Sequence, residues 1–74
     1  ESGESTVGEL PPQELRVFEL IGDGLSNREI ADEMILAEKT IKNYVTSLLQ
    51  KLGMQRRTEA AAFAARLDER RKGG

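Results

Sequence analysis

Two lysines and an asparagine in the middle of the chain have a spacing that suits chemistry on a helix surface. Lys39, Lys42 and Asn43 occupy positions i, i+3 and i+4, so a helix through them places all three on one face. Lysine can donate to guanine O6 and N7, and asparagine can bridge adenine N6 and N7. The same residues also suit a solvated helix face on which lysine serves solubility. The spacing alone leaves both interpretations open.

The residue types that carry most enzyme chemistry are missing. The 74 residues include no cysteine and no histidine, which excludes thiolate zinc ligands, cysteine nucleophiles and imidazole acid–base groups. The sequence also offers no glycine-rich phosphate loop and no paired carboxylates in a plausible cleft. We therefore expect a protein that is not an enzyme, with no catalytic residue, no metal and no cofactor.

Length and hydropathy favour one small cytoplasmic domain. No stretch approaches the ~18 consecutive apolar residues of a membrane span. No basic segment followed by an apolar one opens the chain as a signal peptide would. The absence of cysteine fits a reducing compartment. We expect no membrane association.

Charge is distributed unevenly along the chain. The formal net charge is −2, but residues 1–24 carry six acids and one base, whereas residues 39–57 carry five bases and no acid. The two segments thus have formal charges of −5 and +5. A molecule polarised in this way suits a partner that meets one face only.

The segment with the lysines is predicted to be a helix from Glu38 to Leu52, ended by Gly53. At about 100° per residue, its apolar and polar side chains fall on opposite sides. The apolar side contains Ile41, Val45, Leu48, Leu49 and Leu52, and the polar side contains Lys39, Lys42, Asn43, Thr46 and Gln50.

A shorter helix is predicted just before it. Ser26 and Glu29 form a capping box, and the helix continues to Met34 before the short turn 35–37. Two helices joined by such a turn, the second with a divided face, form a helix-turn-helix. In that motif the second helix lies in the DNA major groove, and the first crosses the phosphate backbone.

The remaining segments complete an all-α, four-helix bundle over residues 10–70. A first helix begins at Pro11 and Pro12, is dense in apolar residues, and ends at 22–24. A last helix, rich in alanine, runs from Thr58 to about Arg70. The polar residues 1–9 are expected to be a linker or disordered tail, and residues 71–74 a disordered tail.

Residues 10–64 resemble the LuxR/FixJ type of helix-turn-helix domain found in bacterial response regulators. The matching residues are Glu14, 24–31, 38–45, 51–53, Arg57 and 59–61. The resemblance implies sequence-specific binding of double-stranded DNA and transcription regulation, as the effector domain of a two-component response regulator. Its implied partners are a pseudo-palindromic operator, an N-terminal receiver domain, a second copy of the chain, and RNA polymerase.

Individual roles follow from the matching positions. The resemblance makes Lys39, Lys42 and Asn43 the base-contacting residues. Residues expected near DNA phosphates are Ser26, Asn27, Thr40, Tyr44, Lys51 and Arg56. Some have a structural alternative: Ser26 and Asn27 can simply cap a helix, and Tyr44 can be a half-buried core residue. Arg56 and Arg57 can each contact a phosphate or form an internal pair with Glu14, and for Arg57 we favour the internal role.

The alanines of the last helix are a candidate dimer seam. In related regulators the last helix packs against its symmetry mate, and small residues permit close approach. The residues expected at this seam are Ala60, Ala61, Ala64 and Ala65. Alanine is also the best helix former, which offers a second explanation for the cluster.

The chain departs from the family pattern at three helix starts, and other functions compete. Pro11 replaces a capping threonine, Ala37 replaces a serine whose cap contributes about 1 kcal/mol, and Arg56 stands where a small polar cap is common.

Region 4 of sigma factors has a similar helix-turn-helix and would bind promoters without a dimer. A helical interaction or dimerisation module without DNA binding is the other alternative.

Overall fold

The computed structural model describes the backbone of residues 2–73 and the side chains of residues 6–69. This part of the chain forms five helices and no strand: α1 (Ser2–Glu9), α2 (Pro12–Gly22), α3 (Asn27–Met34), α4 (Glu38–Leu52) and α5 (Arg57–Gly73). The predicted all-α fold is confirmed. No helix within the described residues is long and apolar enough to cross a membrane.

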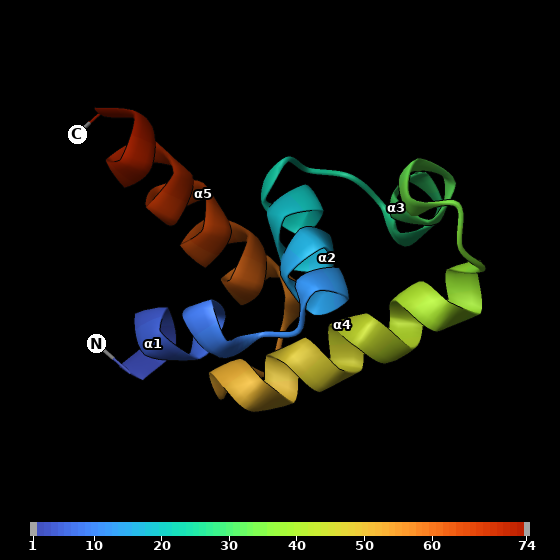
Figure 1. Ribbon diagram of the computed structural model, residues 1–74, viewed down its shortest axis with the longest axis horizontal. Helices are drawn as coiled ribbons and strands as arrows, with labels where there is room; N and C mark the ends of the chain where they lie inside the picture. The colour runs from blue at the N-terminus through green and yellow to red at the C-terminus, as the bar shows by residue number, and fades with distance from the viewer. Residues whose placement is uncertain (1, 74) are drawn as a thin grey trace.

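Helix α2 is the central element. It packs against α3, α4 and α5, and Figure 1 shows α5 and α3 on opposite sides of it, with α4 running past it below. The density of apolar residues noted in its sequence agrees with this central position. Its buried residues are Glu14, Val17, Phe18, Leu20 and Ile21. One carboxylate is therefore buried together with four hydrophobic side chains.

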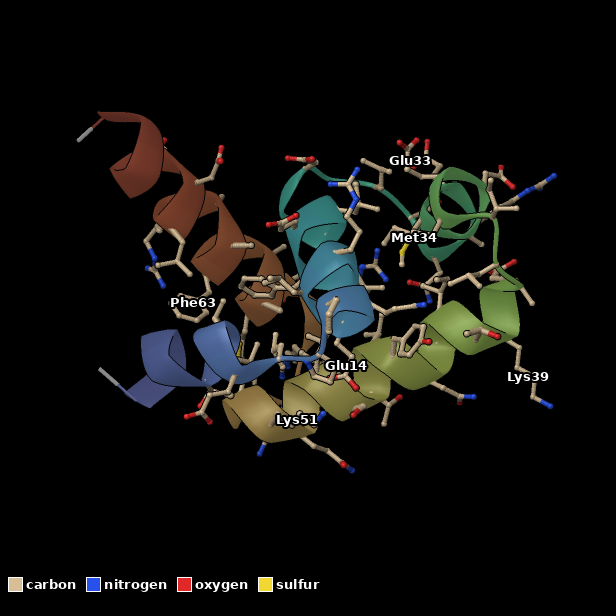
Figure 2. The ribbon with its side chains drawn as sticks, viewed as in Figure 1. Glu14, Glu33, Met34, Lys39, Lys51 and Phe63 are labelled. Atoms are coloured by element: carbon tan, nitrogen blue, oxygen red, sulfur yellow. The ribbon has the colours of Figure 1, made fainter. Side chains whose placement is uncertain are left out.

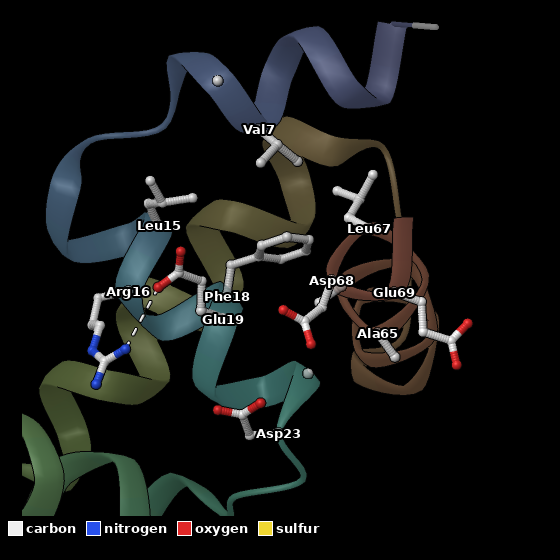
Figure 3. A pocket seen from close by; sticks show the side chains of 13 residues that line it. Val7, Leu15, Arg16, Phe18, Glu19, Asp23, Ala65, Leu67, Asp68 and Glu69 are labelled. Atoms are coloured by element: carbon white, nitrogen blue, oxygen red, sulfur yellow. Dashed lines mark ion pairs between the residues drawn. The ribbon is translucent and has the colours of Figure 1, made fainter. Parts of the chain in front are cut away.

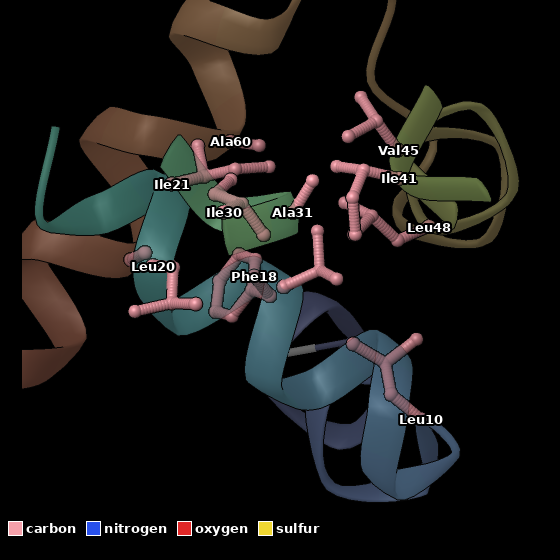
Figure 4. Packing of buried hydrophobic residues seen from close by; sticks show 12 residues of the cluster. Leu10, Phe18, Leu20, Ile21, Ile30, Ala31, Ile41, Val45, Leu48 and Ala60 are labelled. Carbon is pink, nitrogen blue, oxygen red and sulfur yellow. The ribbon is translucent and has the colours of Figure 1, made fainter. Parts of the chain in front are cut away.

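A single hydrophobic core joins α2 to the other helices (Figure 4). The largest fully buried side chains in it are Val17, Ile21, Ile30, Ile41 and Leu48. The rings of Phe18 and Phe63 meet edge to face, with centroids 5.9 Å apart, and connect α5 to α2. Such pairs contribute about 0.5–1.5 kcal/mol beyond the burial of their area.

Residues 2–9 differ from the prediction of a linker or disordered tail, because they form the helix α1. Val7 is half-buried against the core, and its carbonyl accepts a hydrogen bond of 3.2 Å from the N–H of Leu10. One apolar residue is too weak a local signal for a helix, so α1 depends on this tertiary contact. Glu1 lies outside the described residues.

The C-terminal segment also differs from the expectation of a tail at residues 71–74. Helix α5 continues to Gly73, and Gly74 lies outside the described residues. The predicted four-helix bundle is therefore extended by α1 at one end and by about a turn of α5 at the other. The helix-turn-helix itself is unaffected by either difference.

Gly22 is where α2 and α5 approach most closely. A β-carbon added to Gly22 would lie 2.6 Å from the β-carbon of Ala64, closer than two such atoms can approach. Ala64 belongs to the backbone-rigid part of α5 and is 6% exposed, so no flexible side chain can move aside. The small size of both residues sets the distance between the two helices.

We expect Gly22→Ala to lower the free energy of unfolding by about 1–3 kcal/mol, because the added methyl group overpacks the α2–α5 contact. Thermal unfolding followed by circular dichroism measures the change. Gly8→Ala is the control, since nothing lies within 4 Å of a β-carbon there. An unchanged melting temperature for Gly22→Ala would show that α5 is not fixed against α2 as described.

Candidate nucleic-acid interface

Helices α3 and α4 form the predicted helix-turn-helix. The backbone of Ile35 is left-handed (φ 57°, ψ 51°), and the N–H of Leu36 donates to the carbonyl of Ala31 at 2.9 Å. This pattern ends helices in a tight turn, and glycine usually occupies the left-handed position. The turn brings the chain directly into α4. Ile35 itself is 89% exposed.

The start of α3 is fixed by the predicted capping box, which the structure confirms. The hydroxyl of Ser26 accepts from the N–H of Glu29 at 3.2 Å, and the Glu29 carboxylate accepts from the N–H of Ser26 at 2.8 Å. The capping role of Ser26 is thus established. Its hydroxyl hydrogen can still donate to another acceptor.

Helix α4 presents different residues on its two faces, as predicted. Ile41, Val45 and Leu48 are buried against the core. Lys39, Lys42 and Asn43 are exposed, and Figure 2 shows Lys39 pointing away from the body of the molecule. In the described part of the chain these three side chains make no hydrogen bond or ion pair with other residues. Their donors are available to a ligand.

The other flank of α4 is tied to the first turn of α2. The Tyr44 hydroxyl donates to Gln13 at 3.0 Å, the Ser47 hydroxyl donates to Glu14 at 3.1 Å, and the Lys51 ammonium donates to Glu14 at 3.0 Å. The sequence analysis missed Gln13 and Ser47. Tyr44, Ser47 and Lys51 follow one another by three and four residues, so their shared polar flank was a usable signal.

Arg57 does not pair with Glu14, and that expectation was wrong. Its guanidinium donates to the Leu25 carbonyl and to the Asn27 side-chain oxygen, while Lys51 takes the place beside Glu14. Arg57 lies at the start of α5 beside the start of α3, and the Glu14 carboxylate is already occupied by Ser47 and Lys51 of α4. Its role is nevertheless internal, because it connects α5 to the N-terminus of α3.

The residues expected near DNA phosphates have different surroundings. Asn27 receives Arg57 on its oxygen but keeps its amide hydrogens as donors. Thr40 and Tyr44 are half-buried, and Arg56 is exposed. Lys51 is engaged by Glu14 with 43% of its side chain exposed, which reduces the charge it offers to a phosphate. Their contacts with DNA remain predictions.

Two of the four alanines expected at a dimer seam belong to the core instead. Ala60 is 0% and Ala64 is 6% exposed, because both face α2. They cannot meet a second copy of the chain without opening the core. Ala61 is half-buried and Ala65 is exposed, so only these two stay candidates.

The family of the chain is clear from comparison with known proteins. Residues 9–64 match the family model of bacterial regulatory proteins of the luxR family. The chain belongs to this family, as the resemblance of its motifs indicated. The match covers α2, α3, α4 and the first half of α5.

Individual relatives agree with the family. The chain is 55% identical over 65 residues to the DNA-binding transcriptional activator DevR/DosR of Mycobacterium tuberculosis, a match covering 88% of this chain and 30% of that protein. It is 39% identical over 67 residues to the transcriptional regulatory protein LiaR of Bacillus subtilis, covering 88% and 32%. It is 37% identical over 60 residues to the spore germination protein GerE of Bacillus subtilis, covering 81% of each. The chain thus spans about a third of the first two relatives.

Helix α5 begins without a small polar cap, as expected from Arg56, but Glu59 compensates. Its carboxylate accepts from the backbone N–H groups of Gln55 at 2.9 Å and Arg56 at 3.0 Å. These two hydrogen bonds, with a smaller contribution from the Arg56 charge, lower the pKa of the Glu59 carboxyl from its ordinary value of 4.5. The ionised form therefore stabilises the folded state.

We expect the stabilising effect of Glu59 to be present above pH 4.5 and to be lost as the pH falls through its lowered folded-state pKa. Glu59→Gln should unfold at a lower temperature than the wild type at pH 7 and should show a smaller loss between pH 7 and pH 3. Melting temperatures at both values measure this. Glu69→Gln on the same helix is the control, and an equal change for the two variants would contradict the capping role.

Proposed function

We propose that this domain binds double-stranded DNA in a sequence-specific manner and serves transcription regulation. The observation that carries the proposal is the exposed, unpaired cluster of Lys39, Lys42 and Asn43 in the first half of α4. That half of α4 follows the turn of a helix-turn-helix, the part of the motif whose side chains reach base edges in the major groove. The residue types match the acceptors of guanine and the paired groups of adenine.

The distribution of charge also supports a DNA interface at α4. From Lys39 to Arg57 the chain carries five bases and no acid. Lys51 and Arg57 have internal partners, but Lys39, Lys42 and Arg56 are exposed and can neutralise phosphates. Ser26 and Asn27 at the start of α3, together with Thr40, Tyr44 and Arg56, are the proposed phosphate contacts. Lys51 acts mainly through Glu14, and we assign it the role of orienting α4. Phosphate contacts fix the register of the domain on DNA, and base contacts select the sequence.

Lys42→Ala and Asn43→Ala should each weaken binding to the preferred site by about 1–3 kcal/mol and relax base preference at one position. The preferred site comes from selection among random duplexes, and affinities are measured by gel shift at several salt concentrations. Gln50→Ala is the control, because Gln50 is exposed on the same helix but lies beyond its first two turns.

The outcomes separate the competing functions. Wild-type ratios of specific to random binding in both variants would contradict base reading by these residues. If the wild-type protein binds no duplex at low salt, the DNA-binding proposal fails and an interaction module becomes the better interpretation. Binding that weakens with salt by about 0.9 log units per log unit of salt for each contact would support phosphate contacts.

We also propose how the domain assembles on DNA and within a longer protein. A single helix in one major groove reads few base pairs, so two domains on a pseudo-palindromic site would give useful affinity. We propose that Ala61 and Ala65 of α5 lie at the contact between the two copies. DevR/DosR and LiaR are about three times as long as the part this chain matches, which supports a regulator with an N-terminal receiver domain as the whole protein.

Ala65→Glu should reduce affinity for a full palindromic site about tenfold, equivalent to ~1.4 kcal/mol, and leave half-site affinity unchanged. Sedimentation on DNA should give two wild-type domains per full site. Ala64→Glu, in contrast, should lose helical circular dichroism because it buries a charge in the core. One domain per duplex without half-site symmetry would overturn the dimer and favour a mode of binding like that of sigma region 4.

A further inference from the structure

A groove lies between α1, α2 and α5, at the end of the molecule opposite Lys39 (Figures 2 and 3). Its volume is about 740 Å³. Its apolar wall is formed by Val7, Leu15, Phe18 and Leu67, which come from all three helices.

The rim of the groove is acidic. Among the side chains that the structure describes, the carboxylates of Glu19, Asp23 and Glu69 line it together with the guanidinium of Arg16, and these four residues have a formal charge of −2. Arg16 lies 3.5 Å from Glu19, as the dashed line in Figure 3 marks, and 3.9 Å from Glu33 of α3. Its charge is thus shared with a residue outside the groove. The rim attracts cations and repels nucleic acid.

An apolar channel edged by carboxylates is complementary to one kind of macromolecule in particular. A partner helix with apolar residues on one face and lysine or arginine on both flanks fits this groove. Its apolar face would lie in the groove, and its basic side chains would lie against the acidic rim. A second copy of this chain fits less well, because a symmetric contact through the groove brings the two acidic rims together. The location opposite Lys39 keeps the groove open when the first half of α4 is occupied.

We propose that this groove, which we call the acidic groove, docks a basic amphipathic helix of a partner protein. Val7 gives α1 a function in this arrangement, since it supplies the third wall of the groove. The groove is separate from Lys39, Lys42 and Asn43, but it includes Ala65, so a helix docked here and the proposed contact between two copies share this part of α5. A regulator built in this way contacts DNA at one end and a protein at the other.

The test uses the 74-residue chain and a fluorescein-labelled helical peptide with leucine at i, i+3, i+4 and i+7 and lysine on both flanks. Fluorescence anisotropy gives its affinity, and the same peptide with glutamate in place of lysine is the first control. Asp23→Lys and Glu69→Lys should each weaken binding about threefold, and together about tenfold. Both are exposed and lie toward helix C-termini, where lysine is tolerated.

Asp32→Lys is the matched control, because it makes the same change of charge at an exposed site on α3, outside the groove. It should leave peptide affinity unchanged, and chemical shifts of Val7, Leu15 and Leu67 should move when the peptide is added. The proposal is overturned if the basic peptide does not bind, if the acidic peptide binds equally well, or if Asp32→Lys weakens binding as much as the groove variants. It is also overturned if the chain forms a dimer that buries these three residues.

Discussion

Glu14 imposes the constraint on which the arrangement of the helices depends. A carboxylate that is only 7% exposed must be paired, because removing an ion from water costs several kcal/mol. Both partners of Glu14 lie on α4, one turn apart at Ser47 and Lys51. Helix α4 can therefore dock on α2 in only one rotation about its axis. That rotation directs Ile41, Val45 and Leu48 into the core and leaves Lys39, Lys42 and Asn43 outside.

The Glu14 interaction contributes orientation more than stability. Lys51 is 43% exposed, so solvent screens the attraction and little net free energy is gained. The stability of the domain comes instead from the apolar contacts of α2 with its three neighbours. Tyr44 and Gln13 repeat the polar connection nearer the start of α4. Two separate polar connections to α2 thus hold α4 in place, which suits a helix whose exposed side chains must be positioned accurately for binding.

The starts of helices α3, α4 and α5 differ in how many side-chain hydrogen bonds cap them. Helix α3 begins with a complete capping box, and α5 begins with Glu59 acting alone on two N–H groups. The N-cap of helix α4 is Ala37, whose side chain cannot accept a hydrogen bond. The first N–H groups of α4 consequently lack a side-chain acceptor. The same end of α4 carries Glu38 and Lys39, so an acid and a base stand side by side there.

Local sequence patterns were enough to predict several of the helices and their ends. The 3.6-residue period fixed the two faces of α4, Ser26 with Glu29 fixed the start of α3, and Gly53 fixed the end of α4. The family motifs added the helix-turn-helix and its likeness to luxR regulators. These features could be predicted because each depends on residues a few positions apart, whose interactions form within one turn of helix.

Contacts between segments that are distant in the sequence became known from the packing of the helices. Glu14 lies 37 residues before Lys51, and Arg57 lies 30 residues after Asn27, so no local spacing could assign these partners. The alanines of α5 have identical side chains, and it is the contact of Gly22 with Ala64 that turns one pair inward and leaves Ala65 outside. Helix α1 likewise forms around one apolar residue, because Val7 packs against the core and α1 contacts α4, which is far from it in the sequence. Burial in each case depends on how the helices pack, which is a property of the whole chain.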